Sequence, residues 1–80
     1  MAYLGQIVKF KKTLTEESKH YYTVDSIGFR GMVSIDKNND IFIEETDNKI
    51  DTETEKLLCF FINKYLISQN FPNTASHITG

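Results

Sequence analysis

An alternation of apolar and polar residues beside a short Asn- and Asp-rich segment is the feature that most restricts the fold of this chain. Every second residue from 27 to 35 is apolar, with one glycine among them: Ile27, Phe29, Gly31, Val33 and Ile35. The intervening positions are Gly28, Arg30, Met32 and Ser34. Because successive side chains point to opposite faces of a β-strand, the pattern predicts a strand with one buried and one mostly exposed face.

Residues 36–40 predict the turn of a hairpin, since Asn and Asp tolerate positive φ and bond their own backbone. Beyond the turn, Ile41 and Ile43 continue the alternation and would face the core as well. A loop over 36–40 also fixes which residues face each other across the two strands. The predicted pairs are Ile35 with Ile41, Val33 with Ile43, Ser34 with Phe42, and Met32 with Glu44.

Weaker patterns predict the rest of the sheet. Residues 3–10 and 20–24 are rich in β-branched and aromatic types, which favours a strand in each range. The polar range 11–19 between them predicts a loop.

Residues 53–69 predict a helix that ends before Pro72, because proline disfavours helical geometry in the residue before it. The N-terminus carries two competing caps: Thr52, in a capping box with Glu55, and Asp51. At the helical period the core-facing stripe comprises Leu58, Phe61, Ile62 and Tyr65, with Leu57 and Leu66 at its edges.

Four strands followed by a helix, without alternation of the two, indicate an α+β fold. We therefore expect an antiparallel four-stranded sheet with one C-terminal helix packed on one face. Residues 1–72 would form a single small domain and residues 73–80 a polar C-terminal tail. A closed SH3-like barrel with an appended helix is the alternative.

Charge and composition exclude several classes of protein. The chain has no apolar run of membrane-spanning length and no signal-peptide pattern, so we expect a cytoplasmic protein. Its single cysteine, Cys59, permits neither an internal disulfide nor a cysteine-based zinc site. No nucleophile, base and orienting group stand at a suggestive spacing, which favours a protein that is not an enzyme and binds no cofactor, metal or small-molecule substrate.

The formal net charge of −2 conceals an uneven distribution. Residues 36–55 hold eight acidic residues and two lysines, a local charge of −6, so the rest of the chain carries +4. This segment is either a solvated face or an acidic surface that docks on a basic partner.

Apolar side chains that the predicted core does not use indicate where a partner would bind. Met32 and Phe42 would form an apolar spot on the outer face beside Arg30 and Glu44, and Met, Phe and Arg are enriched at interface centres. Asp40, Glu45 and Asp47 would steer the partner. Phe60 and Ile67, on the off-core side of the helix, form a second candidate interface.

These features predict a non-enzymatic protein-interaction module that binds another protein, or a second copy as a homodimer. Inhibitors, antitoxins, immunity proteins and phage-type regulators are the roles that such a chain could fill. The alternative is a small nucleic-acid-binding regulator. Its cationic residues would be Lys9, Lys11, Lys12, Lys19 and Arg30.

Overall fold

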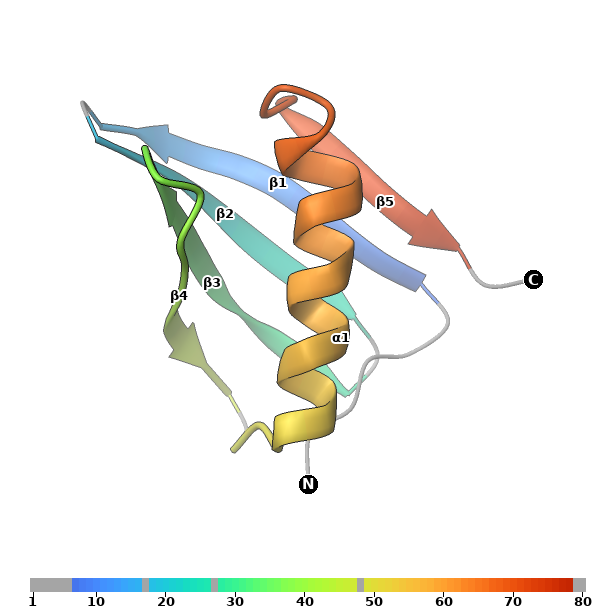
Figure 1. Cartoon of the computed structure of the whole chain (residues 1–80). Helices are drawn as coiled ribbons and strands as arrows, with labels where there is room; N and C mark the ends of the chain where they lie inside the picture. The colour runs from blue at the N-terminus through green and yellow to red at the C-terminus, as the bar shows by residue number, and fades with distance from the viewer. Residues whose placement is uncertain (1–6, 17, 27, 48, 79–80) are drawn as a thin grey trace.

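The computed structural model describes residues 7–16, 18–26, 28–47 and 49–78. Five strands form one antiparallel sheet in the order β4-β3-β2-β1-β5 (Figure 1). The strands are β1 (Ile7–Thr15), β2 (Lys19–Ser26), β3 (Phe29–Asp36), β4 (Ile41–Thr46) and β5 (Thr74–Ile78). Helix α1 (Thr52–Ile62) continues into a π-helical segment, η1 (Asn63–Ile67). The sheet is open, with β4 and β5 at its edges, so the fold is α+β and the barrel alternative is wrong.

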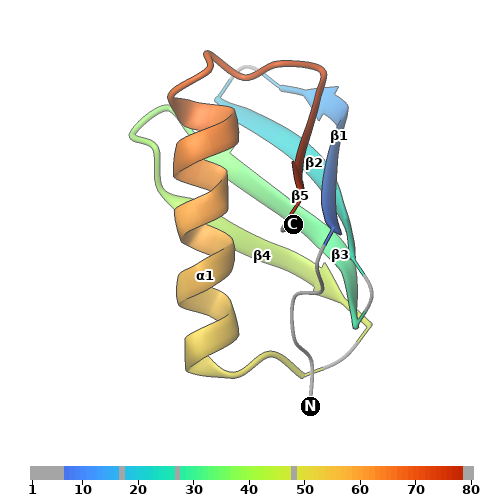
Figure 2. The same cartoon turned by 90° about the vertical axis from the view of Figure 1, so that its right-hand side faces the viewer.

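Helix α1 lies across one face of the sheet and leaves the opposite face without a covering element among the described residues (Figure 2). The core between the two layers is apolar, as the alternating pattern requires. The sheet contributes Val8, Phe10, Tyr22, Val24, Phe29, Val33 and Ile35, and the helical segment contributes Leu58, Phe61, Ile62 and Leu66.

The hairpin of β3 and β4 follows the predicted register in three of its four pairs, Val33–Ile43, Ser34–Phe42 and Ile35–Ile41. Its turn is held by Asp36, whose Oδ1 accepts hydrogen bonds from the amides of Asn38 and Asp40, both at 2.9 Å. The fourth pair is wrong, because Met32 lies opposite Glu45 and the register shifts between Met32 and Val33. Glu44 is therefore the extra residue of a β-bulge.

Gly31 lies next to this bulge, and β4 approaches it too closely for any side chain. A Cβ atom at residue 31 would lie 2.3 Å from the carbonyl oxygen of Glu45 and 3.2 Å from Cα of Thr46. The glycine among the inward positions of the pattern thus marks a close approach of two backbones.

The helix begins one residue earlier than predicted, and Asp51 is the cap rather than Thr52. Asp51 Oδ1 accepts the amide of Thr54 at 2.8 Å, and the hydrogen bonds with Thr54 lower the pKa of Asp51. At the C-terminal end of the helix, the π-helical segment η1 turns through a smaller angle per residue than an α-helix does. Leu66 consequently turns from the edge of the stripe into the core, and Ile67 turns toward it, whereas Leu57 remains 42% exposed.

The chain does not end in a polar tail after the helix, as the sequence predicted. Asn70 and Phe71 both have positive φ and reverse the chain, and Thr74–Ile78 then pairs with β1 as the fifth strand. The turn is fastened to the sheet by Lys12 Nζ, which donates to Phe71 O at 2.7 Å, and by the Tyr22 hydroxyl, which donates to Pro72 O at 2.6 Å. The expected four-stranded sheet with a C-terminal helix is therefore corrected to five strands.

The N-terminal half also differs from the prediction. Residues 11–15 belong to β1 instead of a loop, and β2 extends from Lys19 to Ser26. Gly28, with φ of 117°, lies in the turn between β2 and β3 and not in a strand. The predicted start of the first strand at residues 3–6, and Ile27, lie outside the described residues.

Candidate functional site

The sheet face turned away from α1, here called the outer face, is the surface that most of the predicted binding residues share. Since directly paired residues of an antiparallel sheet point to the same side, the register assigns each side chain to a face. Val33 and Ile35 are buried under the helix, so Met32 and Ser34 project to the outer face. The register adds residues from the neighbouring strands, namely Lys9, Lys11 and Leu14 of β1, Tyr21, Thr23 and Asp25 of β2, and Phe42 and Glu45 of β4.

Near the β3–β4 turn, the outer face carries a small polar network around one carboxylate. Ser34 is fully buried, and its hydroxyl donates to Oε1 of Glu44 at 2.7 Å. Lys19 Nζ lies 3.7 Å from the same oxygen and 4.5 Å from the centre of the Phe42 ring. The network holds Phe42 in place while 42% of it stays exposed.

At the opposite end of β4, Arg30 and Asp47 join the strand end to β3. The amide of Arg30 donates to Asp47 Oδ1 at 3.0 Å, and the amide of Asp47 donates to Arg30 O at 2.9 Å. The Arg30 side chain also pairs with Asp25, Nε to Oδ1 at 3.2 Å, and both side chains are largely exposed. Exposed pairs of this kind add little to stability, so Arg30 remains available to a partner.

The structure thus brings together Arg30, Met32, Phe42, Glu44 and Glu45 on one side of the sheet. Asp40 lies in the turn before β4 and Asp47 directly after the strand, so the length of β4 separates these two charges. At about 3.3 Å per residue that distance is roughly 20 Å. The acidic residues therefore line an edge and do not form one cluster.

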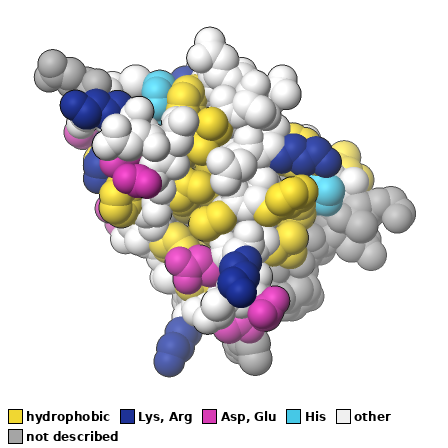
Figure 3. Space-filling model, in the orientation of Figure 1, with side chains coloured by type: hydrophobic (Ala, Val, Ile, Leu, Met, Phe, Trp, Pro, Cys, Tyr) yellow, Lys and Arg dark blue, Asp and Glu magenta, His cyan; other side chains and the backbone are white. Residues whose placement is uncertain are grey.

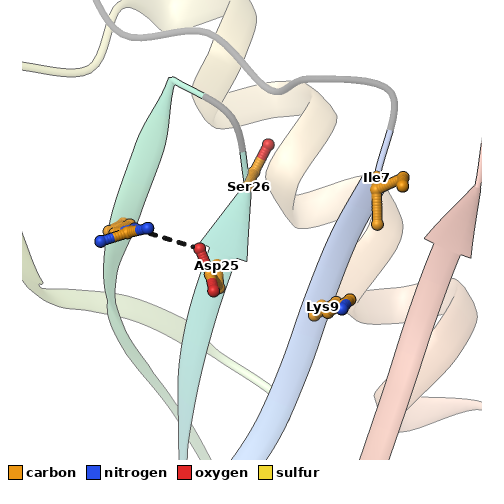
Figure 4. Close-up of a pocket in the computed structure, with 5 residues that line it drawn as sticks. Ile7, Lys9, Asp25 and Ser26 are labelled. Atoms are coloured by element: carbon orange, nitrogen blue, oxygen red, sulfur yellow. Dashed lines mark hydrogen bonds and ion pairs between the residues drawn. The ribbon is translucent and has the colours of Figure 1, made fainter.

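Sequence reasoning placed Lys9 in a strand but did not place Lys11 or Leu14 on this surface, because the polar composition of residues 11–19 predicts a loop there. A hollow of about 230 Å³ adjoins Lys9 and is lined by Ile7, Lys9, Asp25, Ser26 and Arg30. Figure 4 shows this region with α1 behind the sheet, and Lys9 and Asp25 project toward the viewer from neighbouring strands. This hollow is smaller than the sites of about 300–1,000 Å³ that hold small molecules, whereas a second hollow, beside Lys9 and Lys11 and of about 450 Å³, lies within that range.

The second predicted interface, Phe60 with Ile67, is not one continuous patch. Phe60 is 57% exposed, and Lys64 Nζ lies 5.9 Å from its ring centre. Ile67 is half-buried and packs against the core. The exposed apolar surface of the helix is instead Leu57 and Phe60, on the helix-bearing side of the molecule, where hydrophobic side chains reach the surface in several places (Figure 3).

The cysteine and the two histidines are held by packing or by hydrogen bonds within the fold. Burial, and next to it the charge of Glu55, raises the pKa of the Cys59 thiol. Burial, and next to it the charge of Lys12, lowers the pKa of His20, whose ring stacks on Phe71 with centroids 3.9 Å apart. His77 Nδ1 shares a hydrogen bond of 2.7 Å with the Tyr65 hydroxyl.

Within residues 7–16, 18–26, 28–47 and 49–78, no three His, Cys, Asp or Glu side chains are placed to hold a metal ion. No helix in the same part of the chain is both long and apolar enough to cross a membrane.

Comparisons of the chain with protein-family models, with curated proteins and with solved structures find no significant match.

Proposed function

We propose that the protein is a non-enzymatic interaction module that binds another protein chain through the outer face of its sheet. The distribution of exposed apolar side chains carries this proposal. Six large hydrophobic side chains of the described residues are exposed, and four of them project from the outer face: Ile7, Leu14, Phe42 and Ile78. Single exposed apolar residues are ordinary, whereas several on one uncovered face favour an interaction surface.

The chemistry of the face suits a protein partner. Met32, Phe42 and Arg30 are of the types enriched at interface centres, and Tyr21 adds an aromatic ring beside Ser34. The charges nearest to Phe42 are already paired, since Glu44 contacts both Lys19 and Ser34. Covering a paired carboxylate costs less than covering an isolated one, so a partner can exclude water there.

The acidic residues along β4 would guide the approach of the partner. Glu45, Asp47 and Asp40 are exposed at or beside this edge strand. Charges of one sign speed the encounter with an oppositely charged surface and select against like-charged ones. Within this proposal the protein works in the cytoplasm as an inhibitor, antitoxin, immunity protein or phage-type regulator.

Affinity capture with two matched variants tests the proposal. Phe42 on the outer face and Leu57 on the helix are both 42% exposed, so replacing either by Asp should leave the protein folded. We expect Phe42→Asp to lose the proteins that wild type captures from native extract and Leu57→Asp to retain them. Equal capture by the two variants, with circular dichroism unchanged, would contradict the proposal.

Nucleic-acid binding is the second candidate, because Lys9 and Lys11 are exposed on the outer face. Two of the other proposed cations are engaged within the chain, Lys12 with Phe71 O and Lys19 with Glu44. Fluorescence anisotropy with single- and double-stranded oligonucleotides at low salt separates the candidates, since phosphate contacts make binding steeply salt-dependent. Binding at low salt that Lys9→Glu with Lys11→Glu abolishes would support the second candidate.

A further inference from the structure

We propose that the chain covering the outer face is a second copy of this protein, packed face to face about a two-fold axis that runs parallel to the strands between β2 and β3. This inference rests on the proposed function and names the partner of the same surface. It follows from the sheet order and the pairing register, which place complementary side chains at equal heights on strands that the axis would exchange.

The geometry of the axis is simple. In the order β4-β3-β2-β1-β5, a two-fold axis between β2 and β3 exchanges β2 with β3 and β1 with β4, and leaves β5 at the margin. Rotation about an axis parallel to the strands keeps the height along each strand, so residues in one transverse row face residues of the same row. Sheets packed in an aligned sandwich keep their strands within about 30° of each other, which preserves these rows approximately.

The middle row contains two unpaired charges of opposite sign. The register runs from Glu45 through Met32 and Thr23 to Lys11. The axis therefore sets Glu45 against the partner's Lys11, and Met32 against the partner's Thr23. Glu45 and Lys11 are both exposed, and neither side chain makes a hydrogen bond or ion pair with another described residue.

The next row is also self-complementary. Asp47 accepts a hydrogen bond from the Arg30 amide. Arg30 lies opposite Asp25, and Asp25 lies opposite Lys9. The axis sets Arg30 against the partner's Asp25 and Asp47 against the partner's Lys9. Because the interface is isologous, each of these contacts occurs twice.

The third row is apolar at both ends. Phe42 pairs with Ser34, Ser34 with Tyr21, and Tyr21 with Leu14. The axis sets Phe42 against the partner's Leu14, and these side chains are 42% and 51% exposed in the single chain. Two of the exposed hydrophobic side chains on the outer face would thus cover each other in both halves of the dimer.

A two-fold axis perpendicular to the strands fits less well. It would place β4 of one subunit over β4 of the other, so that the acidic edge met itself, and β1 with its lysines over β1. Like charges placed opposite each other destabilise an interface. Charge complementarity therefore selects the axis parallel to the strands.

The contact area sets the expected affinity. Four strands about 4.8 Å apart and about eight residues long give roughly 19 Å by 26 Å, or about 500 Å² from each subunit. The total of about 1,000 Å² lies at the lower limit for a specific interface. We therefore expect a weak dimer that forms in the micromolar range.

Sedimentation equilibrium from about 10 to 500 µM at low salt tests the inference with wild type, Lys11→Glu and Glu45→Lys. Wild type should approach twice the chain mass of 9.3 kDa as its concentration rises. Each reversal puts like charges at two symmetric contacts and should weaken the dimer about tenfold or more. An equimolar mixture of the two variants should restore it, since both contacts between positions 11 and 45 then pair opposite charges in the mixed dimer.

Three results would overturn the inference: a wild type that stays monomeric at about 500 µM, a dimer unaffected by either reversal, or variants whose mixture stays monomeric. Circular dichroism of each variant shows whether it remains folded. Failure of this inference is distinguishable from failure of the proposed function. If wild type were monomeric, loss of a foreign partner on Phe42→Asp would still support the proposed function.

Discussion

Adding a single methyl group at residue 31 should destabilise the protein, although the substitution of glycine by alanine usually favours a strand. The new Cβ would lie 2.3 Å from the carbonyl oxygen of Glu45, and that oxygen belongs to the backbone and cannot rotate away. An ordinary contact needs about 1 Å more, so β4 must move or the pairing next to its bulge must break. Overpacking of this kind costs about 1–3 kcal/mol.

The entropy that alanine removes from the unfolded chain offsets part of this cost, by about 0.4–1 kcal/mol. The net loss for Gly31→Ala is therefore about 1–2 kcal/mol. For a domain of this size, each 1 kcal/mol lowers the melting temperature by about 4–8 °C. We expect Gly31→Ala to melt about 5–15 °C below wild type.

Urea unfolding followed by circular dichroism measures the free energy, and Ser76→Ala on the exposed edge strand β5 is the control for a small change in a strand. The control should stay within about 0.5 kcal/mol of wild type. If Gly31→Ala proved as stable as wild type, the close approach of β4 to Gly31 and the bulge that positions Glu44 and Glu45 would be wrong.

Three further predictions concern groups beneath or beside the sheet. Tyr22→Phe removes the hydroxyl that donates to Pro72 O and should lower the free energy of unfolding in urea by about 1–2 kcal/mol. Burial raises the pKa of Tyr22 to about 12, so this tyrosine should stay protonated in an absorbance titration to pH 11. Because the pKa of His20 is lowered in the folded chain, the unfolded chain binds the proton more readily, and the free energy of unfolding should fall as the pH drops below about 6.5. His20→Phe should flatten this dependence of stability on pH. An unchanged dependence would show that His20 does not cause it. Burial raises the pKa of Cys59, so iodoacetamide at pH 7.5 should alkylate it more slowly than it alkylates the unfolded chain, and an equal rate would show that the thiol is exposed.

The hairpin was predictable because two independent signals agree there. The alternation on both sides of residues 36–40 fixes which side chains face the core, and the turn composition fixes where the strands meet. The bulge was not predictable, since Glu44 and Glu45 are both polar and the pattern does not show which one faces Met32. Only the glycine at residue 31, among the inward positions, indicated an irregularity there.

Strand β5 and the second half of β1 escaped prediction for a related reason. An edge strand has one neighbour and needs few apolar side chains, and only Ala75 and His77 of β5 face the core side, opposite Phe10 and Val8. The polar half of β1, residues 11–15, similarly lacks an apolar signal and is held by pairing with β2. Without these residues as strands, Lys11 and Leu14 could not be assigned to the outer face.

The helix was predictable in extent but not in its final rotation. A constant 100° per residue placed Leu57 and Leu66 equally at the edges of the stripe, and Ile67 on the far side. The π-helical segment from Asn63 changes the rotation over the last turn, which buries Leu66 and brings Ile67 to the core. No residue type in this segment predicts that hydrogen-bond pattern.

Met32 offers the most direct test of the claim that the outer face is the binding surface. The chain has two methionines, and Met32 lies half-buried in the middle row of that face. With carbon-13-labelled methionine methyl groups, a soluble paramagnetic agent should broaden the Met32 signal strongly in dilute protein. The broadening should fall several-fold in the complex, whether with a captured partner or at high concentration of the chain alone. If Met32 remains equally accessible in the complex, the partner binds elsewhere and the outer face is not the binding surface.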